Sequence, residues 1–169
     1  MIRLVNNLLT LAHADARQNS EKYILNISPV LEESVGEAKY LDRKRKITAS
    51  IAPDLVILGN EDILKQVMLI LIDYGVKHSS GDMRIEANNG LADIQIDVID
   101  RGKGIPTGEQ KLIFERFFQG KGESREDGFG LRLSIARTLS AKLGGKISIE
   151  SELGIGSTFT LVFPCYKEL

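Results

Sequence analysis

The stretch Asp100-Arg-Gly-Lys-Gly-Ile-Pro106 decides the fold, because it joins a strand to a tight glycine-bearing loop. It follows the run Ala92-Asp-Ile-Gln-Ile-Asp-Val-Ile99, in which apolar residues recur at every second position. This alternation is typical of a half-buried strand. Gly102 and Gly104 then allow the backbone to turn sharply and to leave space beside it. The carboxylate of Asp100 therefore stands at the end of a strand, next to an open loop.

A second glycine-bearing stretch, Gly128-Phe-Gly-Leu-Arg-Leu-Ser134, precedes an apolar-periodic segment that predicts a helix over Leu131–Lys142. A glycine-rich approach to a helix N-terminus presents free N–H groups and the positive end of the helix dipole, a common way to hold phosphate. Either stretch alone is also typical of an ordinary turn. Together, a carboxylate acceptor for a base amino group and a phosphate cradle indicate a purine nucleotide site.

Four motifs in series resemble the catalytic ATP-binding domain of sensor histidine kinases. They are Asp-x-Gly-x-Gly-Ile-Pro106, Ile113-Phe-Glu-Arg-Phe-Phe118, Gly-x-Gly-Leu-x-Leu-Ser-Ile135 and Gly154-x-Gly-Ser-Thr-Phe-Thr-Leu-x-Phe-Pro164. The resemblance covers roughly residues 25–164 and places the chain in the superfamily that includes gyrase, mismatch-repair and heat-shock ATPases. It implies an α+β fold, a two-layer sandwich of a mixed, mainly antiparallel sheet with helices on one face.

The resemblance also implies which residues hold ATP. Asp100 would accept a hydrogen bond from the adenine amino group, and Gly104 would let the ring approach closely. Lys77 falls where the family carries a basic residue aimed at phosphate, although a solvated lysine is an equal alternative. The three phenylalanines of the second motif would anchor a lid over residues 119–127, or they form ordinary core. The full candidate set is Tyr74, Lys77, Asp100, Gly102, Gly104, Gly128, Gly130, Leu131 and Arg132.

The helix expected over Glu61–Lys77 departs from the family pattern at two positions. Ile70 and Tyr74 stand where the family has asparagines, of which the second supplies an oxygen to magnesium. Positions four apart share one helix face, which should line the nucleotide pocket. Magnesium requires oxygen ligands in octahedral geometry, and a neutral phenol is a poor one. Asp73 points about 100° away from Tyr74 around the helix. Magnesium binding is therefore doubtful, and ATP binding is expected to be weak.

Arg132 is the second departure, since it replaces the third glycine of the family's Gly-x-Gly-Leu-Gly-Leu motif. A long side chain there either blocks the approach of phosphate or lends it a fixed positive charge. An arginine turned to solvent is the third alternative.

The remaining elements follow from periodicity and turn residues. Ser28-Pro29 predicts a helix start with Ser28 as the cap, and Asn60 or Gly59 caps the next helix. Asn88-Asn-Gly90 predicts a hairpin turn, and Gly144-Gly145 ends the last helix. The expected strands are Lys46–Ala52 and Leu55–Leu58 around an Ala-Pro-Asp turn, Met83–Ala87, Leu91–Ile99, Lys146–Glu150 and Thr158–Phe163.

The N-terminal residues 1–18 read as an amphipathic helix, which resembles the second helix of the dimerisation hairpin of histidine kinases. The phosphoacceptor helix has no counterpart here, and His13 lacks the sequence context of a phosphoacceptor. We expect a hinge over residues 19–27 and the ATP-binding domain over residues 28–169. The implied partners are the phosphoacceptor/dimerisation helix, a response regulator and a second copy bound through residues 1–18.

The composition excludes several other classes of function. The 169 residues carry a formal net charge of −1 with both signs interspersed, so neither a nucleic-acid partner nor membrane contact is expected. The single cysteine, Cys165, fits a reducing compartment. Apolar runs fall short of the roughly 20 residues of a membrane span. These features predict a cytoplasmic domain.

Two functions remain from the sequence. The first is the catalytic domain of a two-component sensor kinase, which transfers the ATP γ-phosphoryl group to a histidine outside this chain, with weakened or lost Mg-ATP chemistry. The second is a non-catalytic pseudokinase, or regulatory scaffold, that binds a partner protein.

Overall fold

The computed structural model describes residues 21–120 and 130–168. Its elements are β1 (Tyr23–Asn26), α2 (Ser28–Leu41), β2 (Ile47–Ile51), β3 (Val56–Gly59), α3 (Glu61–His78), β4 (Met83–Asn89), β5 (Asp93–Asp100), α4 (Thr107–Gln110), α5 (Arg132–Lys142), β6 (Lys146–Glu152) and β7 (Gly156–Pro164).

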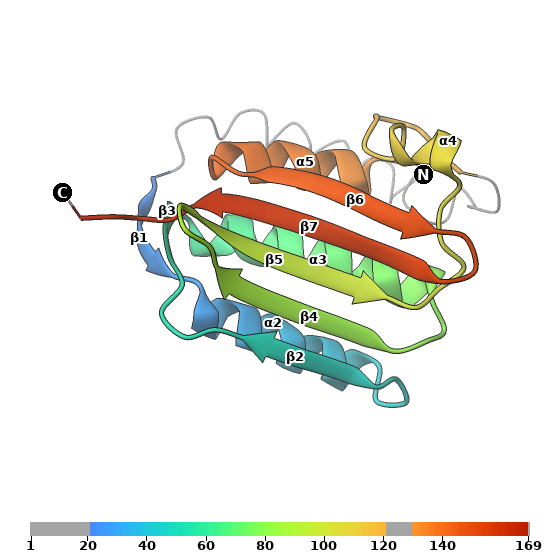
Figure 1. Ribbon diagram of the computed structural model, residues 1–169, viewed down its shortest axis with the longest axis horizontal. Coiled ribbons are helices and arrows are strands. Elements are labelled where there is room, and N and C mark those ends of the chain that lie inside the picture. Colours follow the sequence, from blue (N-terminus) through green and yellow to red (C-terminus); the bar gives the residue numbers. More distant parts are fainter. Residues whose placement is uncertain (1–20, 121–129, 169) are drawn as a thin grey trace.

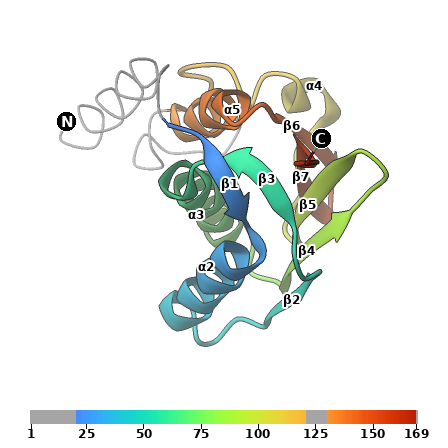
Figure 2. The ribbon, with the colours of Figure 1, turned by 90° about the vertical axis from the view of Figure 1, so that its left-hand side faces the viewer.

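Five strands form one sheet in the order β2-β4-β5-β7-β6. β2 runs parallel to β4, and the other neighbouring pairs are antiparallel. Figures 1 and 2 show α2, α3 and α5 packed together on one face of this sheet. The core lies between the two layers, where the side chains of Phe159 and Phe163 are almost fully buried. The α+β sandwich predicted from the sequence is confirmed.

The two strands beside the Ala-Pro-Asp turn do not pair with each other. β2 joins the five-stranded sheet, whereas β3 pairs with β1 in a separate two-stranded sheet. The backbone at Asp54 has a φ of 55°, which turns the chain between the two sheets. β1 occupies part of the range 19–27 that the sequence suggested as a hinge. The predicted amphipathic helix 1–18 lies outside the described residues.

Ser28 does not cap α2 as expected. Ile27 occupies the cap position, and Ser28 is the first helical residue. The Ser28 hydroxyl donates to the carbonyl oxygen of Ala52 at 2.7 Å and accepts from the backbone N–H of Leu55 at 3.1 Å. It therefore ties the start of α2 to the connection between β2 and β3, because a buried hydroxyl must find partners wherever the fold brings them.

Both ends of α3 are held by side chains, and this helix carries one wall of the candidate site. At its start, the Asn60 side chain accepts from the backbone N–H groups of Asp62 and Ile63, so Asn60 is the cap of the two alternatives that the sequence offered. At its end, the Arg45 guanidinium donates to the carbonyl oxygens of Val76, at 3.0 Å, and Ser79. These bonds satisfy carbonyl groups that a helix end leaves without intrahelical partners.

Candidate nucleotide-binding site

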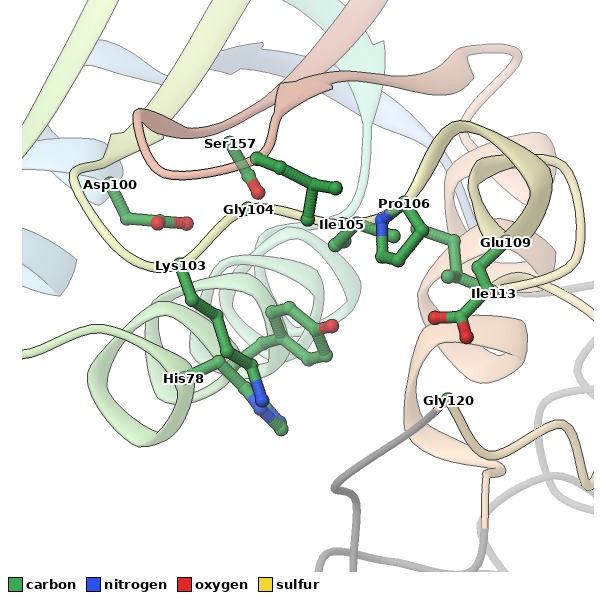
Figure 3. A pocket seen from close by; sticks show the side chains of 12 residues that line it. His78, Asp100, Lys103, Gly104, Ile105, Pro106, Glu109, Ile113, Gly120 and Ser157 are labelled. Atoms are coloured by element: carbon green, nitrogen blue, oxygen red, sulfur yellow. The ribbon is translucent and has the colours of Figure 1, made fainter.

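A cavity of about 170 Å³ lies where the end of α3, the loop after β5 and the β6–β7 turn meet. Figure 3 shows Lys103 and His78 on one side of it, with Glu109 and Ile113 on the other. Typical small-molecule sites measure roughly 300–1,000 Å³, so this cavity suits a nucleobase better than a whole nucleotide. Its lining residues are Tyr74, His78, Asp100, Lys103, Gly104, Ile105, Pro106, Glu109, Ile113, Gly120, Leu153 and Ser157.

Asp100 is the buried acceptor of this cavity. It ends β5, it is 6% exposed, and its Oδ1 accepts a hydrogen bond from the backbone N–H of Gly102 at 3.0 Å. Burial raises the pKa of Asp100, whereas the backbone N–H groups of Gly102 and Ser157, and the charges of His78 and Arg45, act in the opposite direction. A desolvated carboxylate beside a cavity is an effective acceptor for an amino group.

The glycines of the first motif are required by backbone packing. Gly104 has a φ of +77°, and a Cβ there would lie 2.2 Å from the carbonyl oxygen of Glu152. A Cβ at Gly102 would lie 2.7 Å from the carbonyl oxygen of His78. The sequence suggested that Gly104 makes room for a ring. The structure shows that its missing Cβ also makes room for β6, which is a role a sequence motif does not distinguish.

Ser151 and Gln110 hold the loop after β5 in place, and the sequence motifs did not point to them. The Ser151 hydroxyl accepts from the backbone N–H of Ile105 at 2.7 Å. The Gln110 amide donates to the carbonyl oxygens of Ile105 and Ser151, both at 2.9 Å. The bonds to Ser151 join residues more than forty positions apart in sequence, so no local pattern signals them.

Tyr74 lies in the cavity wall, as its position in the family motif suggested. Its ring lies 4.2 Å from the ring of His78, and it meets the ring of Phe159 edge-on at 5.4 Å. Ile70 was expected to share this wall, but it is 5% exposed and belongs to the hydrophobic core. The helix face that carries both residues passes from cavity to core within about one turn.

The described part of the glycine-bearing stretch 128–134 contributes backbone geometry rather than cavity lining. Leu131 is fully buried in the core, and Gly130 has a φ of +71°. A Cβ at Gly130 would lie 2.2 Å from the carbonyl oxygen of Phe118, and the Gly130 carbonyl accepts from the Phe117 N–H at 3.0 Å. Gly128 and residues 121–127 of the expected lid lie outside the described residues.

Only part of the phenylalanine motif is core. Phe114 is 8% exposed, and its ring lies edge-on to that of Phe159 at 6.2 Å. Phe118 is partly buried against the same core. Phe117 has a φ of 65° and is 58% exposed. The motif therefore ties the chain that precedes residues 121–129 to the domain.

Arg132 forms an ion pair with Asp73, which the sequence motifs did not predict. The distance between Arg132 Nη1 and Asp73 Oδ2 is 2.5 Å, and the same carboxylate oxygen lies 3.1 Å from Lys77 Nζ. Neither cation is among the residues that line the cavity. Lys77 instead lines a wider recess beside it, with His78, Ser79, Arg101 and Lys103 among its neighbours.

The cavity fits an adenine base, but the residues of α3 do not fit a magnesium ion. Asp100 offers a buried acceptor at the cavity wall. Ile70 and Tyr74 offer no carbonyl or carboxylate oxygen from their side chains, and the carboxylate of Asp73 is bonded to two cations. Within residues 21–120 and 130–168, three or more histidine, cysteine or acidic side chains do not gather into a metal-binding group.

Among the helices of residues 21–120 and 130–168, none combines the length and the apolar character needed to cross a bilayer.

Solved structures of histidine kinases share this fold. The mycobacterial sensor histidine kinase MprB aligns with a TM-score of 0.73 and 21% identity, over 87% of this chain and 99% of that one. AdeS of Acinetobacter baumannii aligns with a TM-score of 0.76 and 20% identity, over 97% and 78%. Full-length ShkA, solved in complex with AMPPNP, aligns with a TM-score of 0.82 and 24% identity, over 98% and 36%.

Sequence relatives point the same way. The signal transduction histidine-protein kinase ArlS of Staphylococcus aureus (strain USA300) is 32% identical over 169 residues, which are 96% of this chain and 38% of that protein. The chain thus spans well under half of the length of this relative. The family model described as "Histidine kinase-, DNA gyrase B-, and HSP90-like ATPase" matches residues 59–167. The chain belongs to this family, and its fold is that of the catalytic ATP-binding domain of sensor histidine kinases.

Proposed function

We propose that this domain binds an adenine nucleotide through Asp100 and that its Mg-ATP phosphoryl transfer is weakened or lost. In the proposed setting it is the ATP-binding domain of a two-component sensor kinase. Its partners are a phosphoacceptor helix carrying the target histidine outside this chain and a response regulator. The family is one of ATP-binding domains, and the structure of ShkA in complex with AMPPNP is consistent with that role.

Asp100 and its surroundings support the first half of the proposal. Its carboxylate is buried at the end of β5, and the loop beside it is fixed by Gly104 packing on Glu152. A hydrogen bond between an amino group and such a charged acceptor contributes about 1.5–3 kcal/mol to binding. These features form a preorganised base site, since little has to move when the ligand enters.

The position of Tyr74 is the single observation that supports the second half of the proposal, the weakened or lost Mg-ATP phosphoryl transfer. Tyr74 stands at a position where the family places a magnesium-ligating amide, and its ring lies in the cavity wall between His78 and Phe159. Phosphoryl transfer from ATP depends on positioning and on charge stabilisation by metal ions. Without a suitable oxygen from α3, the metal loses a ligand, and transfer is expected to be slow or absent.

A second candidate is a non-catalytic regulatory module that uses the same fold to bind a partner protein. The specific observation that favours it is the ion pair between Arg132 and Asp73. This pair links α5 to α3 through Asp73, which also contacts Lys77, the basic residue that the family pattern aims at phosphate. A domain of this kind would signal through its shape rather than through turnover.

Titration of the protein with a fluorescent ATP analogue, with and without Mg²⁺, separates these functions. We expect binding that changes by less than about threefold when Mg²⁺ is chelated, which corresponds to less than about 0.7 kcal/mol. Tight binding that is lost on chelation would contradict the weakened metal chemistry and indicate a working kinase. Failure to bind the analogue under either condition would support the regulatory module and contradict the nucleotide site.

A further inference from the structure

The carboxylate of Asp73 joins two cations from different helices at one oxygen atom. Oδ2 lies 2.5 Å from Arg132 Nη1 on α5 and 3.1 Å from Lys77 Nζ on α3. The three charges sum to +1 because one carboxylate faces two cations. A cluster of this kind retains attraction for a further anion.

The three side chains are partly open to solvent. Their exposed fractions are 31% for Asp73, 30% for Arg132 and 37% for Lys77. An incoming anion can therefore reach them without unfolding any element. Because partly exposed ion pairs hold their partners weakly, a phosphate oxygen can replace the carboxylate as the partner of either cation.

The cluster borders the candidate base site. Tyr74, which lines the cavity, directly follows Asp73 in α3. His78, which follows Lys77, lines both the cavity and the neighbouring recess, and Lys103 does the same. A ligand whose base contacts Asp100 would thus leave the cavity beside Lys77, which shares the Asp73 carboxylate with Arg132.

Guanidinium is suited to take over the role of a metal at this place. Its planar array of N–H donors matches two phosphate oxygens at once, and its positive charge persists over the whole physiological pH range. The residues of α3 offer a magnesium ion no suitable set of oxygen ligands, as described above. The loss of metal ligands at Tyr74 and the gain of a cation at Arg132 therefore affect the same region of the site.

We propose that Arg132 and Lys77, which pair with Asp73 in the free protein, form a metal-independent binding site for the phosphate tail of an adenine nucleotide. This inference rests on the proposed nucleotide site at Asp100. Arg132 and Lys77 bind phosphate oxygens, and the Asp73 carboxylate is the internal anion that pairs with the two cations until phosphate replaces it. The proposal concerns binding alone and includes no transfer step.

Calorimetric titration of the whole chain with adenosine, ADP and pyrophosphate in EDTA tests the proposal. We expect ADP to bind at least tenfold more tightly than adenosine without any divalent metal. The change Arg132→Gln should reduce this preference to threefold or less and leave the affinity for adenosine unchanged. Arg137→Gln is the matched control, because Arg137 lies on the same helix in an exposed ion pair with Glu115; it should retain the preference.

The change Asp73→Asn should shift the affinity for ADP in the direction opposite to Arg132→Gln. Removing the competing carboxylate should leave both cations available and raise the affinity for ADP at least twofold, with no change for adenosine. A purely structural ion pair between α3 and α5 would instead make Asp73→Asn and Arg132→Gln equally destabilising, without an effect on the ADP-to-adenosine ratio, and that result would overturn the proposal.

The remaining outcomes also discriminate. Equal affinities for ADP and adenosine in the parent protein would refute the phosphate site while leaving the base site intact. Pyrophosphate that binds as tightly as ADP, in a protein that does not bind adenosine, would identify an anion site unrelated to nucleotides and would also overturn the proposal. If neither adenosine nor ADP binds, the proposed function itself fails.

Discussion

The proposed base end and the proposed phosphate end of the site differ in how far they keep the family pattern. At the base end, Asp100 and Gly104 retain the motif and are fixed by packing against β6 and β7. At the phosphate end, Tyr74 and Arg132 replace the expected amide and glycine, and Arg132 is engaged with Asp73. The difference teaches that the residues proposed for base recognition are separate from those proposed for metal-dependent chemistry, so that a chain can keep the first set while it changes the second.

The largest expected effect lies at the base end, in the change Asp100→Asn. An amide presents its own donor where the adenine amino group points, so we expect adenosine affinity to fall by about 1.5–3 kcal/mol, or roughly 12- to 150-fold. Asp97→Asn is the control, because this residue lies on the same strand three positions earlier and therefore on the opposite face of the sheet. Unchanged affinity in the Asp100 variant, with circular dichroism intact, would place the base site elsewhere.

The change Gly104→Ala tests whether the base end depends on backbone geometry. The Cβ would lie 2.2 Å from the Glu152 carbonyl oxygen at a φ of +77°, and strain of this kind typically costs about 1–3 kcal/mol. We expect a lower free energy of unfolding by chemical denaturation. Gly108→Ala, where a Cβ would meet nothing within 4 Å, is the matched control. Equal stability of the two variants would show that the loop relaxes freely.

The pH dependence of stability tests the electrostatic state of the base end. Because burial raises the pKa of Asp100, the folded protein retains this proton to a higher pH than the unfolded chain. The contribution of Asp100 to stability is therefore complete below the ordinary aspartate pKa, about 3.9, and is lost as the pH rises through the raised value. Relative to Asp100→Asn, the parent should lose stability in urea titrations as the pH rises above the ordinary aspartate pKa of about 3.9. A constant difference would contradict the raised pKa.

The smallest expected effect concerns the phosphate end, in the change Tyr74→Asn. It restores one neutral oxygen ligand, so we expect Mg²⁺ to strengthen ATP binding by about three- to tenfold more than in the parent, or about 0.7–1.4 kcal/mol. Titrations with ATP in Mg²⁺ and in EDTA measure this difference. The same Mg²⁺ dependence in parent and variant would show that position 74 does not control the metal, and that the two ends are less separate than proposed.

The sequence predicted those features that depend on local patterns. Three such features follow from residues that lie within a few positions of one another. They are the strand that ends at Asp100, the capping of α3 by Asn60 and the end of α5 at Gly144. The hairpin of β6 and β7 follows from alternation around Gly154 and Gly156 for the same reason. Local chemistry determines such features almost regardless of the rest of the fold.

The features that the sequence could not predict depend on distant contacts. β2 and β3 flank one turn yet enter different sheets, because each finds its partner strand far along the chain. Arg132 and Asp73 are 59 positions apart, so their ion pair becomes visible only in three dimensions. Ile70 and Tyr74 share a helix face, but periodicity alone cannot tell where that face leaves the core and meets a cavity.

The Arg45 side chain has a consequence for motion at the site. Helix ends are normally the places where backbone amides exchange fastest with solvent, because the last turn opens without disturbing the core. Here the last turn of α3 carries Tyr74 and His78, and Arg45, reaching from the α2–β2 connection, holds it through Val76 and Ser79. We therefore expect the cavity wall and that connection to open together as one cooperative unit. A substitution at Arg45, outside the cavity lining, would loosen the wall that faces the base.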